Sequence, residues 1–295
     1  MKKTVFTGAG VAIITPMYSN GSINYEELAK IIEFQIENKT DAIIVCGTTG
    51  ESPTMSDDEH IECVRFAVQQ TAGRIPVIAG AGSNDTNYAV WLSKEAKKAE
   101  ADALLHVTPY YNKCSPKGLV KHFETIADST DLPVILYNVP SRTGMTIKPE
   151  TYLELSKHPN IVATKEASGD ISLIAQISQL CGDDLAIYSG NDDQIVPIMS
   201  LGGIGVISVF SNICPRQAHD ICDLYLQGRV LESTKLQLEY LELINTLFVE
   251  TNPMPIKYAM NLLGYQAGGC RLPLDELLDS NKDLLKNLMK THHLI

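Results

Sequence analysis

Residues 160–190 read NIVATKEASGDISLIAQISQLCGDDLAIYSG and contain the repeating unit of the fold. Apolar runs at 160–165 and 185–190 enclose a stretch, 170–181, in which apolar residues recur at helical spacing. Short continuous apolar runs of this kind indicate strands that are covered on both faces, as in parallel sheets. The segment therefore predicts one strand–helix–strand unit of an α/β fold.

The same alternation extends in both directions along the chain. The predicted strands are residues 11–15, 41–47, 75–80, 101–109, 132–140, 160–165, 185–190 and 203–209, and the predicted helices between them are residues 24–38, 57–72, 85–99, 116–128, 148–157, 170–181 and 192–201. Eight such repeats in roughly 225 residues predict a (β/α)8 barrel of the TIM type. An open doubly wound sheet is the alternative, but AGAGSND at 79–85 lacks the third glycine of its dinucleotide-binding motif.

The pattern changes after Val209, where helical patterns follow one another without strands. They lie at residues 215–227, 233–248, 254–263 and 275–291. Ser233 is predicted to cap the second of them, because serine is favoured at that position. We therefore expect a catalytic barrel of residues 1–225 and a C-terminal helical extension of residues 226–295, packed on the barrel or on a partner subunit.

The composition is that of a globular protein with an acidic surface. Of 295 residues 44% are hydrophobic, and the formal net charge is −11. A negative charge disfavours general attraction to nucleic acid or to anionic membranes, so neither is an expected partner. An anionic substrate would have to be held by local cations.

Compartment is predicted from the termini and the cysteines. No apolar stretch approaches the ~20 residues of a membrane-spanning helix, and no apolar segment of a signal peptide follows Lys2 and Lys3. The seven cysteines include no C-x-x-C pair and several lie in apolar runs, which is typical of buried thiols in a reducing compartment. The sequence therefore predicts a cytoplasmic protein.

In (β/α)8 barrels the working residues lie at the carboxyl ends of the strands and in the loops that follow. Small and polar residues gather at these positions: GTTGES at 47–52, TPYYN at 108–112, YNVPSRTG at 137–144, Lys165, SGND at 189–192 and Ile207-Ser208. One end of the predicted barrel is therefore the candidate site.

Lys165 ends an apolar strand. Water keeps a lysine amine almost wholly protonated at neutral pH, whereas burial among apolar neighbours disfavours the charged form. A neutral amine can attack a ketone and form a Schiff base. Glu166 should point to the opposite side of the strand. The residues alone leave open a nucleophile in the barrel mouth and a strand-end lysine that reaches solvent, and position alone favours the second.

The other candidates also have two interpretations each. Tyr137 can exchange a proton through its phenol, or it can fill the barrel. Thr48 and Thr49 can offer donors to a carboxylate, or they can belong to an ordinary turn. Arg142 can hold a carboxylate through two hydrogen bonds, or it can lie in solvent. No metal site is predicted, because the seven histidines show no ligand spacing such as H-E-x-x-H.

Taken together and in this order, GTTGES, TPYYN, YNVPSRTG and the KEASG that begins at Lys165 resemble the dihydrodipicolinate synthase (4-hydroxy-tetrahydrodipicolinate synthase) family. The resemblance covers nearly the whole chain and includes FVETNPMPIK at 248–257 and RLPL at 271–274. It implies the condensation of pyruvate with L-aspartate 4-semialdehyde, the first committed step of diaminopimelate and lysine biosynthesis. It implies no metal and no organic cofactor, only a covalent pyruvate imine on Lys165.

The resemblance also implies roles for individual residues. Lys165 corresponds to the Schiff-base lysine and Tyr137 to the proton donor and acceptor, with Thr48 and Tyr111 as the other members of the relay. In the family the residue that corresponds to Tyr111 comes from a neighbouring subunit, so we expect at least a homodimer. Members of the family are commonly tetramers built from two such dimers, so we expect a homotetramer. The implied substrate-binding residues are Thr49 and Ile207 for pyruvate, Gly190 in the active-site segment of the seventh strand, and Arg142 for the carboxylate of the semialdehyde.

Two other functions are weighed against this one. N-acetylneuraminate lyases and 2-keto-3-deoxy sugar-acid aldolases share the barrel, the lysine and the tyrosine, but Arg142-Thr143-Gly144 after YNVPS, together with GTTGE, favours the synthase. A barrel that has lost catalysis and serves as a ligand sensor or scaffold is disfavoured by the intact set Lys165, Tyr137, Thr48 and Tyr111.

Some members of the family bind lysine at the dimer interface as a feedback inhibitor. The pattern of inhibited enzymes is kept at Ser52, His60, Asn84 and Tyr110. Asp57 stands where those enzymes have a histidine, and Tyr88 where they have a glutamate. Losing that carboxylate should weaken the binding of a cationic ligand, so we predict weak or absent inhibition.

Overall fold

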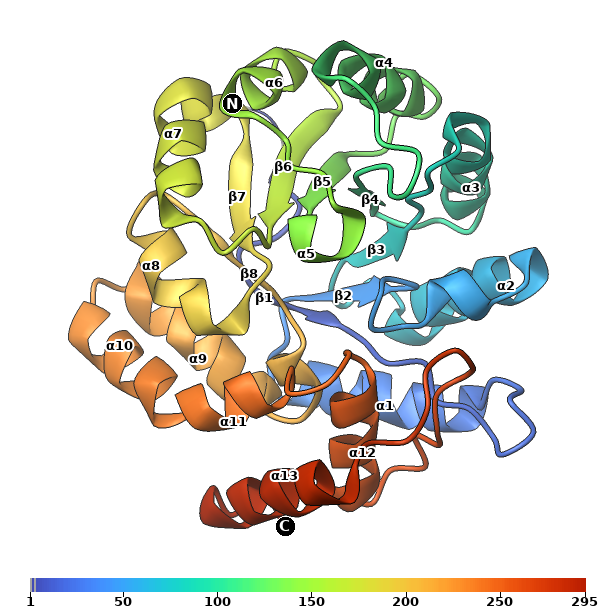
Figure 1. Ribbon diagram of the computed structural model, residues 1–295, viewed down its shortest axis with the longest axis vertical. Coiled ribbons are helices and arrows are strands. Elements are labelled where there is room, and N and C mark those ends of the chain that lie inside the picture. The colour runs from blue at the N-terminus through green and yellow to red at the C-terminus, as the bar shows by residue number, and fades with distance from the viewer. Residues whose placement is uncertain (1, 3) are drawn as a thin grey trace.

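The computed structural model describes residue 2 and residues 4–295, and its centre is a closed barrel of parallel strands (Figure 1). Each strand pairs with the next one in the chain, and the last pairs with the first. The strands are β1 (Gly8–Ala12), β2 (Ala42–Val45), β3 (Val77–Gly80), β4 (Ala103–Val107), β5 (Val134–Asn138), β6 (Ile161–Glu166), β7 (Ala186–Ser189) and β8 (Gly205–Ser208). The predicted (β/α)8 barrel is confirmed.

Helices surround the strands, and the C-terminal ones gather on one side of the barrel (Figure 1). The helices up to the last barrel helix are α1 (Tyr25–Glu37), α2 (Asp57–Thr71), α3 (Thr86–Lys98), α4 (Pro116–Ala127), α5 (Pro140–Thr143), α6 (Pro149–Leu155), α7 (Ile171–Cys181), α8 (Ile195–Met199) and α9 (Pro215–Leu226). The remaining ones are α10 (Val230–Glu239), α11 (Leu241–Thr246), α12 (Met254–Leu262) and α13 (Asp279–Thr291). None of the helices in the described residues is long and apolar enough to span a bilayer. We propose that the extension starts at residue 226, where α9 ends.

The core has two layers, as the alternation of strand side chains requires. A larger cluster packs between the outer faces of the strands and the helices. A smaller cluster fills the barrel interior, with members such as Ile44, Ile78, Leu105, Ile135 and Ile207. Because the interior is packed with side chains, the space for a ligand is confined to the mouth of the barrel.

The first strand lies three residues earlier than the pattern predicted. Residues 11–15 were expected, but the strand is Gly8–Ala12. Two residues after its end, the Ile14 N–H donates to the side chain of Asn212 at 3.0 Å and not to a neighbouring strand. At its start β1 pairs with β8 through Gly8 and Gly205, and the two backbones lie so close that a side chain on Gly205 would lie 1.9 Å from the Gly8 carbonyl oxygen. In the sequence alone, the glycines required by this close approach suggest a loop, so the start of the strand was missed.

Ser233 does not cap a helix, and that prediction is wrong. The helix begins earlier, at Val230, just after Gly228, whose φ of 79° is accessible to glycine. Ser233 is buried inside α10, and its hydroxyl donates to the Ile221 carbonyl of α9 at 2.6 Å. The single helix predicted at 233–248 is two helices, α10 and α11, which meet at Tyr240.

The C-terminal extension is tied to the mouth of the barrel by a buried ion pair. Lys257 of α12 lies 2.8 Å from Glu51, which follows β2, and both side chains are almost fully buried. The Glu51 carboxylate also accepts the Arg271 N–H at 2.9 Å, and the Lys257 amine also donates to the Gly269 carbonyl at 2.5 Å. Separating the two side chains would leave an uncompensated buried charge, so the pair keeps α12 against the turn after β2. The segment that precedes Lys257 is thereby held over the mouth.

Candidate active site

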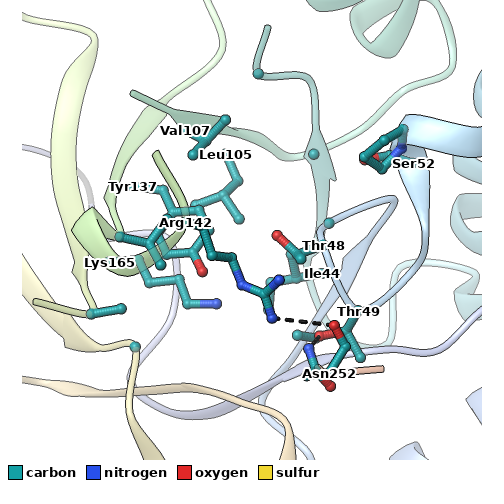
Figure 2. A pocket seen from close by; sticks show the side chains of 18 of the residues that line it. Ile44, Thr48, Thr49, Ser52, Leu105, Val107, Tyr137, Arg142, Lys165 and Asn252 are labelled. Atoms are coloured by element: carbon teal, nitrogen blue, oxygen red, sulfur yellow. Dashed lines mark hydrogen bonds between the residues drawn. The ribbon is translucent and has the colours of Figure 1, made fainter. Parts of the chain in front are cut away.

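A cavity of about 910 Å³ opens where the strands end at their carboxyl termini. Its walls come from the segments after β2, β3, β4, β5, β6, β7 and β8 and from the C-terminal segment 248–252. The predicted catalytic and substrate-binding residues on its lining are Thr48, Thr49, Tyr137, Arg142, Lys165 and Gly190. Figure 2 shows five of them in one space: Thr48, Thr49, Tyr137, Arg142 and Lys165.

Lys165 lies inside this cavity and not in bulk solvent. Only 6% of the residue is exposed, and its amine lies over the ring of Tyr137, with Nζ 4.4 Å from the ring centroid. Among the residues that the structure describes, the Lys165 amine donates no hydrogen bond and has no carboxylate within 4.0 Å. The amine is therefore enclosed, covered by an aromatic face, and uncommitted to any partner.

The register of two strands brings the lysine and the tyrosine together. Tyr137 on β5 pairs directly with Lys165 on β6, and both side chains point into the barrel. The next residues in each strand, Asn138 and Glu166, are also a pair and point outward, where they hydrogen-bond to each other at 2.7 Å. The expected orientation of Glu166 away from the lysine is confirmed.

The threonines lie in a tight turn after β2. The turn closes through the Gly50 N–H, which donates to the Gly47 carbonyl at 3.1 Å. It crosses β3 so closely that a side chain on Gly80 would lie 2.2 Å from the Cys46 carbonyl oxygen. Thr49 is buried and its hydroxyl oxygen accepts a hydrogen bond from the Asn252 amide at 3.0 Å, while Thr48 faces the cavity.

Arg142 lies in α5, the single helical turn that follows β5. The Thr143 hydroxyl accepts from the Thr108 hydroxyl at 3.1 Å and holds the turn against the end of β4. The guanidinium of Arg142 donates to the Asn252 carbonyl at 3.2 Å and extends into the same space as the Lys165 amine (Figure 2). A guanidinium has five N–H donors, so donors remain for a substrate carboxylate.

Asn252 is the site residue that sequence reasoning missed. Its amide donates to Thr49 and its carbonyl accepts from Arg142, so one residue links the two predicted carboxylate binders (Figure 2). Its Oδ1 atom is buried and has no partner among the described residues. The signal available was its place in FVETNPMPIK, one of the stretches that carry the family resemblance.

Three predicted residues do not line the cavity. Tyr111 is 91% exposed and has a φ of 66°, an uncommon conformation for a residue other than glycine. Ile207 is buried in the barrel interior. Asn84 lies outside the lining and its side-chain amide donates to the Tyr110 carbonyl at 3.1 Å.

Gly190 lies at the edge of the cavity under a steric constraint. Its N–H donates to the Glu166 carbonyl at 2.6 Å, which joins the end of β7 to the end of β6. A side chain here would lie 2.7 Å from the Cβ of Ala167. The strand ends can meet this closely only if position 190 carries no side chain.

All but Asn84 of the residues that keep the lysine-inhibited pattern lie on the lining of the same cavity. Ser52, His60 and Tyr110 belong to its lining, and so does Tyr88. The Tyr88 hydroxyl donates to the Asp57 carboxylate at 2.5 Å. Burial, followed by this hydrogen bond, raises the pKa of Tyr88 to about 12. The two residues that depart from the inhibited pattern are therefore paired with each other.

No group of three or more histidine, cysteine, aspartate or glutamate side chains in the described part of the chain is arranged to hold a metal ion. Two buried histidines lie outside the cavity, and burial lowers the pKa of His106 to about 3 and that of His122 to about 4. Their imidazoles contact the hydroxyl groups of Ser93 and Thr86. The predicted catalytic and substrate-binding side chains on the cavity lining offer an amine, a phenol, two hydroxyls and a guanidinium.

Comparison with known proteins agrees with this geometry. Residues 5–292 match the sequence model of the Dihydrodipicolinate synthetase (DHDPS) family. Proteins named 4-hydroxy-tetrahydrodipicolinate synthase are 57% identical in Lachnoclostridium phytofermentans, over 292 residues and 99% of each chain, and 55% identical in Caldicellulosiruptor saccharolyticus, over 285 residues, 97% of this chain and 96% of the relative.

A solved structure shares the architecture at nearly full length. The crystal structure of DHDPS from Cyanidioschyzon merolae with lysine bound superposes with a TM-score of 0.97 at 39% identity, covering 99% of this chain and 100% of that one. Family match, identity and fold agree over the same residues. The chain therefore belongs to the dihydrodipicolinate synthetase family.

Proposed function

We propose that this protein is a 4-hydroxy-tetrahydrodipicolinate synthase that joins pyruvate to L-aspartate 4-semialdehyde, the first committed step of diaminopimelate and lysine biosynthesis. The observation that carries the proposal is the enclosed, unpaired amine of Lys165 over the ring of Tyr137, with the Arg142 guanidinium in the same cavity. The names of the relatives that are more than half identical support the same activity.

The chemistry begins at Lys165. Its neutral amine attacks the keto carbon of pyruvate to give a carbinolamine, whose hydroxyl takes up a proton and leaves as water, so that a protonated imine forms. The imine withdraws electrons from the methyl group, which loses a proton to give an enamine. The enamine carbon then attacks the aldehyde carbon of the semialdehyde, whose oxygen takes up a proton. The amino group of the semialdehyde finally attacks the imine carbon, which closes the ring and releases the lysine amine.

Proton transfers in this sequence fall to Tyr137, whose ring the Lys165 amine overlies. Thr48 faces the same cavity and supplies a hydroxyl for a relay. Tyr111, the proposed third member, points away from its own cavity and is held in a strained backbone conformation, which suits a residue that completes the site of a second subunit. The functional unit is then at least a homodimer, and we propose a homotetramer of two such dimers.

Substrate carboxylates are assigned to the turn after β2 and to α5. The Thr49 side chain and turn amides hold the carboxylate of pyruvate, with backbone contacts near Gly190 and Ile207. Arg142 holds the carboxylate of the semialdehyde. Covalent capture on Lys165 supplies the electron sink, so neither a metal nor an organic cofactor is required for this reaction.

The acceptor substrate distinguishes this function from a sugar-acid aldolase. With pyruvate saturating, kcat/KM for L-aspartate 4-semialdehyde should exceed that for N-acetylmannosamine or glyceraldehyde by at least about 10-fold, because these sugars offer no carboxylate to the Arg142 guanidinium. Coupled steady-state assays of each acceptor measure this ratio. A sugar aldehyde that proves the better acceptor would identify the protein as an aldolase instead.

Feedback inhibition by lysine is expected to be weak or absent. The hydroxyl of Tyr88 already pairs with Asp57, and no glutamate carboxylate is presented to a ligand amine at that position. Steady-state rates should be unchanged by sub-millimolar L-lysine. As the matched control, the double variant Asp57→His, Tyr88→Glu should become more sensitive to lysine than the parent. Substantial inhibition of the parent enzyme by sub-millimolar L-lysine would show that Asp57 and Tyr88 do not prevent lysine from binding.

We also propose a cytoplasmic location for this protein. All seven cysteines are free thiols, five of them buried, which suits a reducing compartment.

A further inference from the structure

Directly behind the lysine–tyrosine pair lies a buried carboxylate that the mechanism does not use. Glu166 is 1% exposed and follows Lys165 on β6, so its side chain points to the opposite face of the strand. No cationic side chain within 4.0 Å pairs with it in the described residues. An ionised carboxylate without a cation persists in a protein interior only when hydrogen bonds satisfy it.

Four donors from three segments satisfy this carboxylate. Oε1 accepts from the Asn138 amide on β5 at 2.7 Å and from the Tyr152 hydroxyl on α6. Oε2 accepts from the hydroxyl of Ser168 at 2.7 Å and from its N–H at 3.4 Å, in the loop after β6. Burial raises the pKa of the Glu166 carboxyl, and the hydrogen bonds from Tyr152, Ser168 and Asn138 act against that rise.

The same network reaches the loop that carries Arg142. Asn138 is fully buried, and its Oδ1 accepts the N–H of Ile147 at 3.2 Å, in the segment that follows α5. The Thr164 hydroxyl, on the outward face of β6, donates to Tyr152 at 3.3 Å. The strand with Tyr137, the strand with Lys165 and the segment after Arg142 are therefore bonded to one cluster of side chains.

We propose that Glu166 is a positioning residue of the reaction: by binding Asn138 and Ser168 it fixes the ends of β5 and β6 so that the Lys165 amine stays over the ring of Tyr137. This inference rests on the proposed function. The register of the two strands makes the link short, because Asn138–Glu166 is the pair immediately next to Tyr137–Lys165. A displacement of about 1 Å between reacting groups can cost about 10²-fold in rate.

The test is the variant Glu166→Gln, which keeps shape but places a donor amide against the donors that now surround the carboxylate. We expect a fall in kcat of about 10²-fold with little change in the KM for pyruvate, while borohydride with saturating pyruvate still labels every chain once, more slowly. Glu27→Gln is the control: Glu27 is also buried, on α1, and accepts the Gln266 N–H at 2.9 Å and the Lys30 amine at 2.8 Å. It should lower stability and leave kcat unchanged.

Full labelling separates positioning from partial unfolding, because unfolded chains lower the labelled fraction and the activity together. Asn138→Ala and the double variant complete a cycle, in which non-additive losses of kcat support the proposed route through Asn138. If Glu166→Gln does not fold, Tyr152→Phe removes one donor at constant shape and should still lower kcat a few-fold.

A folded, fully labelled Glu166→Gln enzyme with kcat within twofold of the parent would overturn the inference. So would a loss of kcat that merely follows the labelled fraction. A parent enzyme that never captures pyruvate would instead contradict the proposed function, so the two failures are distinguishable.

Discussion

Replacing Lys165 with alanine is expected to lower kcat/KM for the condensation by on the order of 10⁵–10⁶-fold, as the loss of a covalent nucleophile does in other enzymes. The substitution removes the amine that we propose to form the imine and leaves the cavity walls in place. Turnover measured with aspartate semialdehyde at saturating pyruvate checks the effect.

Lys121→Ala, at an exposed position on α4, is the matched control and should keep the parent rate. Circular dichroism and thermal melting establish that both variants are folded. A folded Lys165→Ala enzyme with a rate within tenfold of the parent would remove this lysine from the mechanism.

Replacing Tyr137 with phenylalanine should lower kcat by about 10²- to 10⁴-fold, the usual contribution of a positioned acid–base group. The ring that covers the Lys165 amine remains, so binding of pyruvate and the fold should be almost unaffected. Only the hydroxyl that we propose to take up and return protons is lost. Steady-state kinetics at saturating concentrations of both substrates measure the change.

Tyr188→Phe provides the comparison for a buried tyrosine of the same barrel. Tyr188 stacks on Phe6 and its hydroxyl donates to the Phe6 carbonyl at 2.6 Å, so its loss should cost about 1 kcal/mol of stability without changing kcat. Near-normal turnover in Tyr137→Phe would show that another group carries the protons.

The sequence predicted best what depends on local pattern. Apolar runs such as those that hold Ile44 and Ile135 are buried on both faces in a parallel barrel, and their continuity marks the strands. The candidate residues at the strand ends converge because parallel strands all end at the same mouth. Lys165, Tyr137 and Arg142 come from different elements and still share one cavity.

The sequence predicted poorly what depends on distant partners. β1 starts at Gly8 because another glycine, Gly205, crosses it, and nothing near residue 8 shows that. Asn252 contacts Arg142 across 110 residues of chain, so no spacing rule relates them. Ser233 reads as a helix cap, although its partner is the carbonyl of Ile221 in the preceding helix. Each error comes from tertiary contacts that outweigh a local preference.

The pairing of Tyr88 with Asp57 and the exposure of Tyr111 had no sequence signal of their own. The first requires that two helices, α2 and α3, bring the side chains within 2.5 Å. The second concerns a residue that we propose to act in the site of a second copy of the chain, which a single sequence does not describe.

Reduction of the enzyme with borohydride in the presence of pyruvate, followed by peptide mapping, tests the central claim most directly. The peptide that contains Lys165 should gain the mass of one reduced pyruvate, and no other lysine should be labelled. Omitting pyruvate should leave the peptide unmodified. Labelling of a different lysine, or equal labelling of the Lys165→Ala variant, would contradict the account of an enclosed amine that captures the keto acid.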